Sequence, residues 1–263
     1  MRPLAVSTYP WAAPLLIGAA FFAAAETARL APGAAPAAVP ALGAFASFAA
    51  AFAAFGLARM AHRPRIALLT AATPGVLVAA AFACFLIIDS SAGRIALAAT
   101  AVVLSAAYLA YLRGIVRHDE RFRDEDFSHL SFAVHVISVF FAFAFAFAVP
   151  NYLQTPMPAI TAAVSVVILL ATAESIRRAG LGGRDAALLS AAFVAFGAQL
   201  YLALSFLPTT NLVNAAVGTV LYASGLHAAV TVLSGRSSRP AFRRQFALSF
   251  VMLAVVFATA RWA

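Results

Sequence analysis

The sequence predicts an all-α protein, a polytopic bundle of about nine transmembrane helices. Of its 263 residues, 64% are hydrophobic and only 10% are charged, and the mean hydropathy is +0.94. The apolar residues form long stretches joined by short polar connections. A soluble domain carries far more charge. Stretches of about 17–23 apolar residues match a hydrocarbon core of about 30 Å, at a rise of about 1.5 Å per residue.

We expect a single integral membrane domain over residues 1–263, with no soluble domain. The expected spans are 9–25, 37–58, 66–88, 95–112, 128–149, 157–176, 186–207, 212–233 and 245–260. The first span has an alternative interpretation as a cleaved signal peptide, because Ala23–Ala25 follow a short apolar run; eight spans would then remain. The segment Ala31–Pro40, rich in Ala and Pro, is expected to be an extended connector.

Arginines gather in every second loop of this arrangement. They follow the second, fourth, sixth and eighth spans: Arg59, Arg63, Arg65; Arg113, Arg117, Arg121, Arg123; Arg177, Arg178, Arg184; Arg236, Arg239, Arg243, Arg244. The loops between hold only Arg29 and Arg94. Because basic loops stay in the cytoplasm, we expect a multi-pass protein of a bacterial cytoplasmic membrane, with its N-terminus in the cytoplasm and its C-terminus outside.

The composition excludes several classes of chemistry. All 18 basic residues are Arg, so there is no lysine for a Schiff base or for a phosphate-binding loop. Cys84 is the single cysteine, which excludes an internal disulfide and a CxxC redox pair. The net charge of +9 is explained by the arginines at the membrane surface, so we expect lipid and no nucleic acid as a partner, and no cofactor.

Polar side chains inside the expected spans mark the candidate site, because they are costly in lipid. Two spans repeat the spacing three, four, three: Ser128, Ser131, His135, Ser138 and Ser224, His227, Thr231, Ser234. Each set shares one helix face, and both imidazoles fall about 10 Å below the cytoplasmic surface. The candidate residues are His135, His227, Glu174, Ser131 and Ser224, with no catalytic residue and no metal ligand assigned.

These residues admit four interpretations. The favoured one is hydrogen bonding between helices. The others are a proton-coupled carrier of a small solute or lipid, axial ligation of a b-type haem, and acid–base chemistry on a lipid-linked substrate. Glu174 precedes Arg178 by four residues, which favours an ion pair on one helix; alternatively Glu174 tunes an imidazole.

The loop 113–129 carries the one dense charge cluster in the sequence. Its candidate docking residues for a protein partner are Arg117, Asp119, Glu120, Arg121, Arg123 and Asp124. Mixed signs in a short loop are typical of a solvated helix extension. A metal or magnesium–pyrophosphate site is the alternative, yet the aspartate-rich signatures of membrane prenyltransferases and CDP-alcohol phosphotransferases are absent.

The last third of the chain has Leu207-Pro208-Thr209 after a span, a basic Arg243-Arg244 turn and a terminal Ala260-Arg261-Trp262. In these features it resembles an uncharacterised family of polytopic membrane proteins from candidate-phyla bacteria. The resemblance implies a multi-pass fold and brings no known activity. The sequence therefore favours a non-enzymatic component or partner of a membrane assembly.

Overall fold

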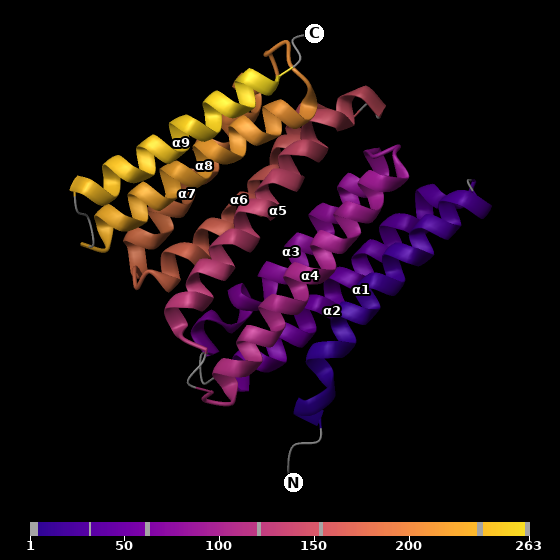
Figure 1. The fold of residues 1–263 in the computed structure, drawn as a ribbon, viewed down its shortest axis with the longest axis horizontal. Coiled ribbons are helices and arrows are strands. Elements are labelled where there is room, and N and C mark those ends of the chain that lie inside the picture. The colour runs from indigo at the N-terminus through magenta and orange to yellow at the C-terminus, as the bar shows by residue number, and fades with distance from the viewer. Residues whose placement is uncertain are drawn as a thin grey trace. The chain divides into compact units, whose positions relative to one another are not determined.

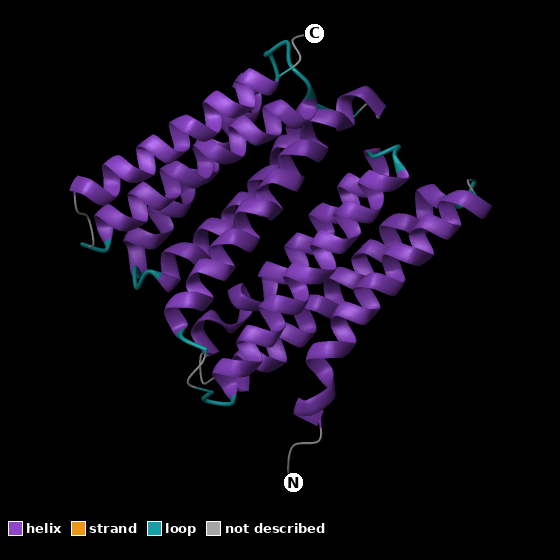
Figure 2. Cartoon of the chain, in the orientation of Figure 1, coloured by secondary structure: helices purple, strands orange, loops and turns teal. Residues whose placement is uncertain are grey.

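A computed structural model of the chain describes residues 5–31, 33–60, 64–119, 122–152, 155–235 and 239–260. The helices are α1 (Ala5–Leu30), α2 (Ala35–Met60), α3 (Pro64–Ile87), α4 (Ser91–Val116), α5 (Asp124–Tyr152), α6 (Met157–Arg178), α7 (Gly183–Leu204), α8 (Asn211–Leu233) and α9 (Arg239–Thr259). Over these described ranges there is no strand (Figure 2). Nine helices in the described residues are long and apolar enough to cross a membrane, which confirms the all-helical fold class.

Most helices begin and end within a few residues of the expected spans, but the connector predicted over Ala31–Pro40 is wrong from Ala35 onward. Helix α2 begins at Ala35 and runs through Pro36 and Pro40. Pro36 lies in the first turn, where a backbone N–H has no partner within the helix and is not missed. The neighbouring alanines are the strongest helix formers. Helix formation by alanine therefore prevails here over the turn signal of proline.

The chain divides into two compact units, residues 1–138 and 139–263. The first holds α1–α4 and the beginning of α5, drawn from indigo to magenta in Figure 1; the second holds the rest of α5 and α6–α9. Connections such as residues 88–90, between α3 and α4, are short. Short connections make successive helices antiparallel neighbours, which brings side chains from adjacent helices together within each unit.

In the first unit the closest pair of helices is α2 and α3. Helix α2 buries a face of small side chains that includes Gly43, Ala46 and Ala50. On α3, a Cβ built on Gly75 would lie 3.1 Å from the backbone oxygen of Ser47. Helices in lipid gain little from the hydrophobic effect, so close van der Waals contact between small residues drives their association. Small residues at this interface thus set the position of α3, which carries part of the candidate site.

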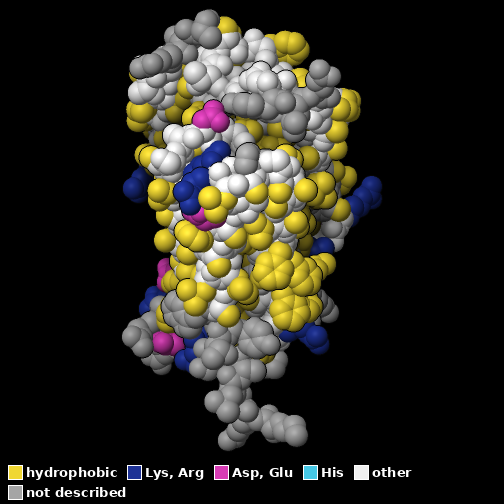
Figure 3. Space-filling model, turned by 90° about the vertical axis from the view of Figure 1, so that its right-hand side faces the viewer, with side chains coloured by type: hydrophobic (Ala, Val, Ile, Leu, Met, Phe, Trp, Pro, Cys, Tyr) yellow, Lys and Arg dark blue, Asp and Glu magenta, His cyan; other side chains and the backbone are white. Residues whose placement is uncertain are grey.

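The outer surface of the first unit is apolar. Phe45, Phe48 and Phe52 of α2 are 57%, 71% and 58% exposed. Hydrophobic side chains are spread over the face drawn in Figure 3, and the charged side chains on it stand in separate small groups. Water would penalise so large an apolar surface, and lipid does not. The surface of the unit therefore suits helices that are surrounded by acyl chains.

In the second unit α6 packs on α7, α7 on α8, and α8 on α9. Gly197 of α7 leaves room for Ile168 of α6, and Gly218 of α8 faces Phe143 of α5. Helix α9 is different, because none of its most apolar 18-residue window is buried. The second unit therefore has a core among α5–α8 and carries α9 on its outside.

We predict that Gly43→Ala destabilises the first unit. The new Cβ would lie 2.9 Å from both Cβ and Cγ of Phe82, and Phe82 is itself buried and stacked on Phe21 of α1 with ring centroids 4.0 Å apart. We expect a loss of about 1–3 kcal/mol, measured by SDS titration in mixed micelles. Gly56→Ala on the same helix meets no atom within 4 Å and is the matched control. Equal losses in the two variants would contradict close packing at Gly43.

Candidate functional site

His135 lies in the part of α5 that belongs to the first unit, and it is buried. Its Nε2 is 2.9 Å from the Thr73 hydroxyl oxygen on α3. The same hydroxyl lies 3.3 Å from the Leu69 carbonyl oxygen and can donate to it. A hydroxyl has one proton, so when that proton points to Leu69, Nε2 of His135 is the donor to Thr73. The imidazole is thereby held by a neighbouring helix.

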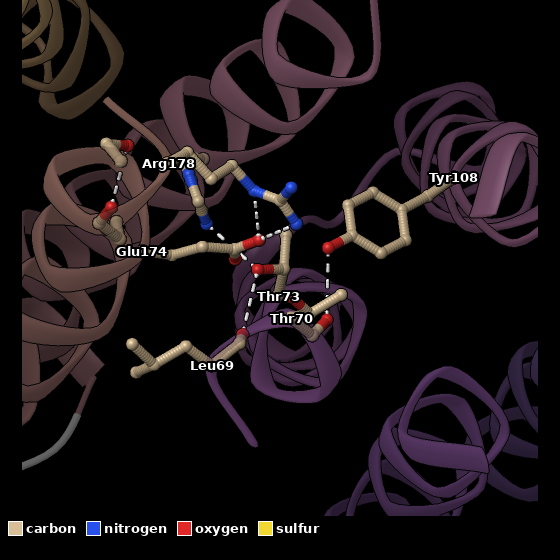
Figure 4. Close-up of polar contacts among 9 residues, drawn as sticks. Leu69, Thr70, Thr73, Tyr108, Glu174 and Arg178 are labelled. Atoms are coloured by element: carbon tan, nitrogen blue, oxygen red, sulfur yellow. Dashed lines mark hydrogen bonds and ion pairs between the residues drawn. The ribbon is translucent and has the colours of Figure 1, made fainter. Parts of the chain in front are cut away.

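The residues next to Thr73 form a second contact, which is created by a proline inside α3. Pro74 has no N–H, so the carbonyl of Thr70, four residues earlier, loses its usual helical donor. The Tyr108 hydroxyl of α4 donates to that carbonyl oxygen at 3.0 Å (Figure 4). Tyr108 is fully buried and its ring lies 5.0 Å from that of Phe127 on α5. One carbonyl without its helical donor thus ties α4 to α3.

Sequence reasoning found Ser131 and His135 but missed Thr70, Thr73 and Tyr108. Ser131 and Ser138 are both buried on α5 together with His135, and Ser138 donates to the Val134 carbonyl of its own helix at 2.8 Å. Pro74 could have identified Thr70, because a proline within a span leaves the carbonyl four residues earlier in need of another donor. Which side chain supplies that donor depends on packing and cannot be read from spacing.

The second unit repeats this arrangement with different residues. Pro150 lies inside α5, so the carbonyl of Ala146 has no helical donor. The Tyr201 hydroxyl of α7 lies 3.3 Å from that carbonyl oxygen and 3.4 Å from the Met157 sulfur. Tyr201 is fully buried, and its ring lies 5.1 Å from that of Phe147. The tyrosine fixes α7 against α5.

Glu174 forms the ion pair that the i,i+4 spacing predicts. Arg178 donates from Nε to Oε1 of Glu174 at 2.7 Å, and its terminal nitrogen contacts the same oxygen (Figure 4). The side chains are only 1% and 6% exposed for Glu174 and Arg178, respectively. A buried carboxylate costs several kcal/mol unless a partner compensates its charge. Arg178 supplies that compensation and neutralises the charge of Glu174 within α6.

The remaining candidates lie on α8. Ser224 shares a 2.5 Å hydrogen bond with Ser249 of α9, whereas His227 is exposed. Two residues before Ser224, the fully buried Tyr222 is hydrogen-bonded to Thr172 of α6 at 2.8 Å. Glu174, Ser224 and His227 belong to the second unit and His135 to the first. A shared site for His135 and His227 therefore stays a prediction.

An aromatic contact lies beside the loop that follows α4. Phe122 packs against Gly114, which has no side chain to displace it, and its ring meets that of Tyr111 edge to face at 4.9 Å. The Phe122 amide donates to the Asp119 carbonyl at 2.9 Å. Arg117 and Arg123 are exposed and Asp119 is half-buried. Glu120 and Arg121 lie outside the described residues, as does the side chain of Asp124.

Within the described part of the chain, no three His, Cys, Asp or Glu side chains are grouped closely enough to hold a metal ion. The site contacts are instead hydrogen bonds and one ion pair between the protein's own groups. No family model, no curated protein and no solved structure matches the chain. The geometry of these residues is therefore the basis for any functional conclusion.

We predict that the cost of Tyr108→Phe depends on Pro74. The variant keeps the ring and removes the donor to the Thr70 carbonyl, which costs about 1–3 kcal/mol of unfolding free energy. Pro74→Ala restores a backbone N–H to that carbonyl, so Tyr108→Phe should cost less in the Pro74→Ala background. SDS titration of the wild type, the two single variants and the double variant gives the unfolding free energies for this double-mutant cycle. The explanation fails if Tyr108→Phe costs the same in both backgrounds.

A second cycle tests the buried ion pair. Glu174→Leu and Arg178→Leu each leave one charge buried without its partner, and each should cost about 3–5 kcal/mol of unfolding free energy. The double variant should cost clearly less than the sum. Glu26 and Arg29 form an exposed pair, with side chains 36% and 69% exposed, and Glu26→Gln with Arg29→Gln should change stability by at most about 1 kcal/mol. Additive losses at Glu174 and Arg178 would rule out coupling between them.

Proposed function

We propose that this chain is a multi-pass component of a bacterial cytoplasmic membrane that acts by holding a partner protein, without catalysis of its own. In this proposal the N-terminus lies in the cytoplasm and the C-terminus outside. The support for the orientation is the concentration of arginines after the second, fourth, sixth and eighth spans and the rule that such loops stay in the cytoplasm.

The observation that carries the proposal is that polar groups at three of the candidate positions, two of them buried, bind other side chains of the protein. Thr73 binds His135, Arg178 binds Glu174, and Ser249 binds Ser224. A group that acts on a substrate needs to reach it, and these groups already have partners within the protein. Their arrangement favours stabilisation of the helix bundle as their role.

The charged loop after α4 is the docking surface in this proposal. Arg117, His118, Arg123, Glu125 and Asp126 are exposed, while the buried Phe127 anchors the start of α5 against Tyr108 and Tyr111. A segment that presents both signs of charge suits a protein surface with complementary charges, because such charges steer encounter and set register. In the proposed orientation the partner is a cytoplasmic protein or the cytoplasmic part of a membrane protein.

The test is purification from native membranes in a mild detergent, followed by native mass spectrometry and an absorption spectrum. We expect a stoichiometric protein partner. Arg117→Gln with Arg123→Gln should reduce the recovered partner severalfold, because it removes exposed charges that act over about 10 Å at moderate ionic strength. Arg177→Gln with Arg184→Gln is the matched control, since both arginines are exposed on the next basic loop.

Burial of the ionisable His135 favours a second candidate, a proton-coupled carrier of a small solute or lipid, because buried ionisable groups in membrane proteins often line transport pathways. The same sample separates the candidates. If the protein is recovered without a partner but with a bound solute, and the His135→Gln variant no longer binds that solute, the carrier is favoured over the docking protein. A haem absorption band would instead favour histidine ligation of a b-type haem.

A further inference from the structure

Helix α9 is held from one side. It packs on α8, and the hydrogen bond between Ser249 and Ser224 lies on that side. The rest of its surface is exposed, since none of its most apolar window is buried. The charges and the apolar side chains of α9 indicate what can bind to that surface.

Two rows of exposed side chains run along this surface, and each begins with an arginine. One row is Arg243, Phe246 and Phe250, and the other is Arg244, Leu248 and Val255. Residues three, four, seven and eleven apart share a helix face. The four apolar members are between 52% and 73% exposed. At about 1.5 Å per residue, the second row is about 16 Å long, close to half of a hydrocarbon core of about 30 Å.

The arginines at the head of the rows lack acidic neighbours in the sequence. No Asp or Glu follows Asp185 anywhere in the chain. In the described residues, neither Arg243 nor Arg244 takes part in an ion pair. The exposed phenylalanines of α2 differ, because the nearest arginine, Arg59, lies over the Phe55 ring at 5.7 Å. Helix α9 thus differs from α2 in having two exposed guanidinium groups next to its exposed apolar side chains.

We propose that this surface of α9 binds an anionic phospholipid. The lipid phosphate pairs with Arg243 and Arg244. A guanidinium group can form two parallel hydrogen bonds with phosphate oxygens, and its charge attracts anionic headgroups. The acyl chains lie along Leu248 and Val255, the row below Arg244, because the row of Phe246 and Phe250 lies on a different side of the helix. The match is one of charge and length together: a negative headgroup at the arginines and apolar chains over half the membrane thickness. This proposal does not depend on a protein partner.

The experiment uses the full-length protein, purified in detergent and stripped of lipid. Phosphatidylglycerol or phosphatidylcholine is then added, and bound lipid is counted by native mass spectrometry. We expect tighter binding of phosphatidylglycerol. Arg243→Gln with Arg244→Gln should weaken that binding about thirtyfold, from about 1 kcal/mol for each arginine at an anionic surface, and should leave phosphatidylcholine binding unchanged.

Arg177→Gln with Arg184→Gln removes the same charge from two other exposed arginines and should keep the preference for phosphatidylglycerol. Equal weakening in both double variants would overturn the proposal, since net charge alone would explain it. A wild-type protein that binds both lipids equally would overturn it too. Displacement of phosphatidylglycerol by millimolar inorganic phosphate would assign the arginines to a soluble anion, and would also overturn it.

Loss of folding is separated from loss of binding by gel filtration and by the thermal midpoint in lipid-free detergent. If the double variant does not elute as the wild type, Arg243→Gln and Arg244→Gln are measured singly. Each should weaken phosphatidylglycerol binding about fivefold. Arg243→Lys with Arg244→Lys keeps the charge and should retain most of the preference. Folded single variants with wild-type lipid preference would overturn the proposal.

Discussion

One constraint shapes a contact in each unit of the structure: a backbone carbonyl that loses its helical donor inside an apolar helix is stabilised by another donor from the protein. Pro74 and Pro150 each create such a carbonyl, at Thr70 and Ala146, and in each unit a buried tyrosine from another helix donates to it. Lipid offers no hydrogen bonds, so these contacts cannot be replaced by solvent. Each proline therefore also selects the helix that packs beside it, α4 in the first unit and α7 in the second.

The same constraint explains why hydroxyl groups in these helices are weak evidence of chemistry. Ser47, Thr100, Ser190 and other hydroxyls donate to the carbonyl four residues earlier in their own helix. A serine or threonine so bonded adds no uncompensated polar group to an apolar helix. Regular spacing of Ser, Thr and His along one face is thus compatible with packing alone. Evidence of a site requires a group that the protein itself leaves accessible.

The sequence predicts the nine long helices of the described residues well, because apolar length is a local property and an apolar solvent demands helices. It also predicts the Glu174–Arg178 pair, which depends only on spacing within α6. It does not predict that the pair is buried, nor that His135 meets Thr73, because both depend on which helices pack together. The connector expected over Ala31–Pro40 fails for a local reason, since alanine favours helix and a proline in the first turn permits it.

The polar groups of this chain fall into two sets with different consequences. Some lie inside the units and are bonded to one another, as Tyr222 is to Thr172, and these contribute to stability. Others are exposed charges, among them those at the loop after α4 and at the start of α9, which a partner or a lipid can reach. The two surfaces belong to different units and differ in kind: the loop carries both signs, whereas α9 carries arginine alone. A mixed surface can set the register of a protein, while a purely basic one above apolar side chains matches an anionic lipid. Function in this protein is therefore to be sought on its surfaces, where the two proposals can be tested separately.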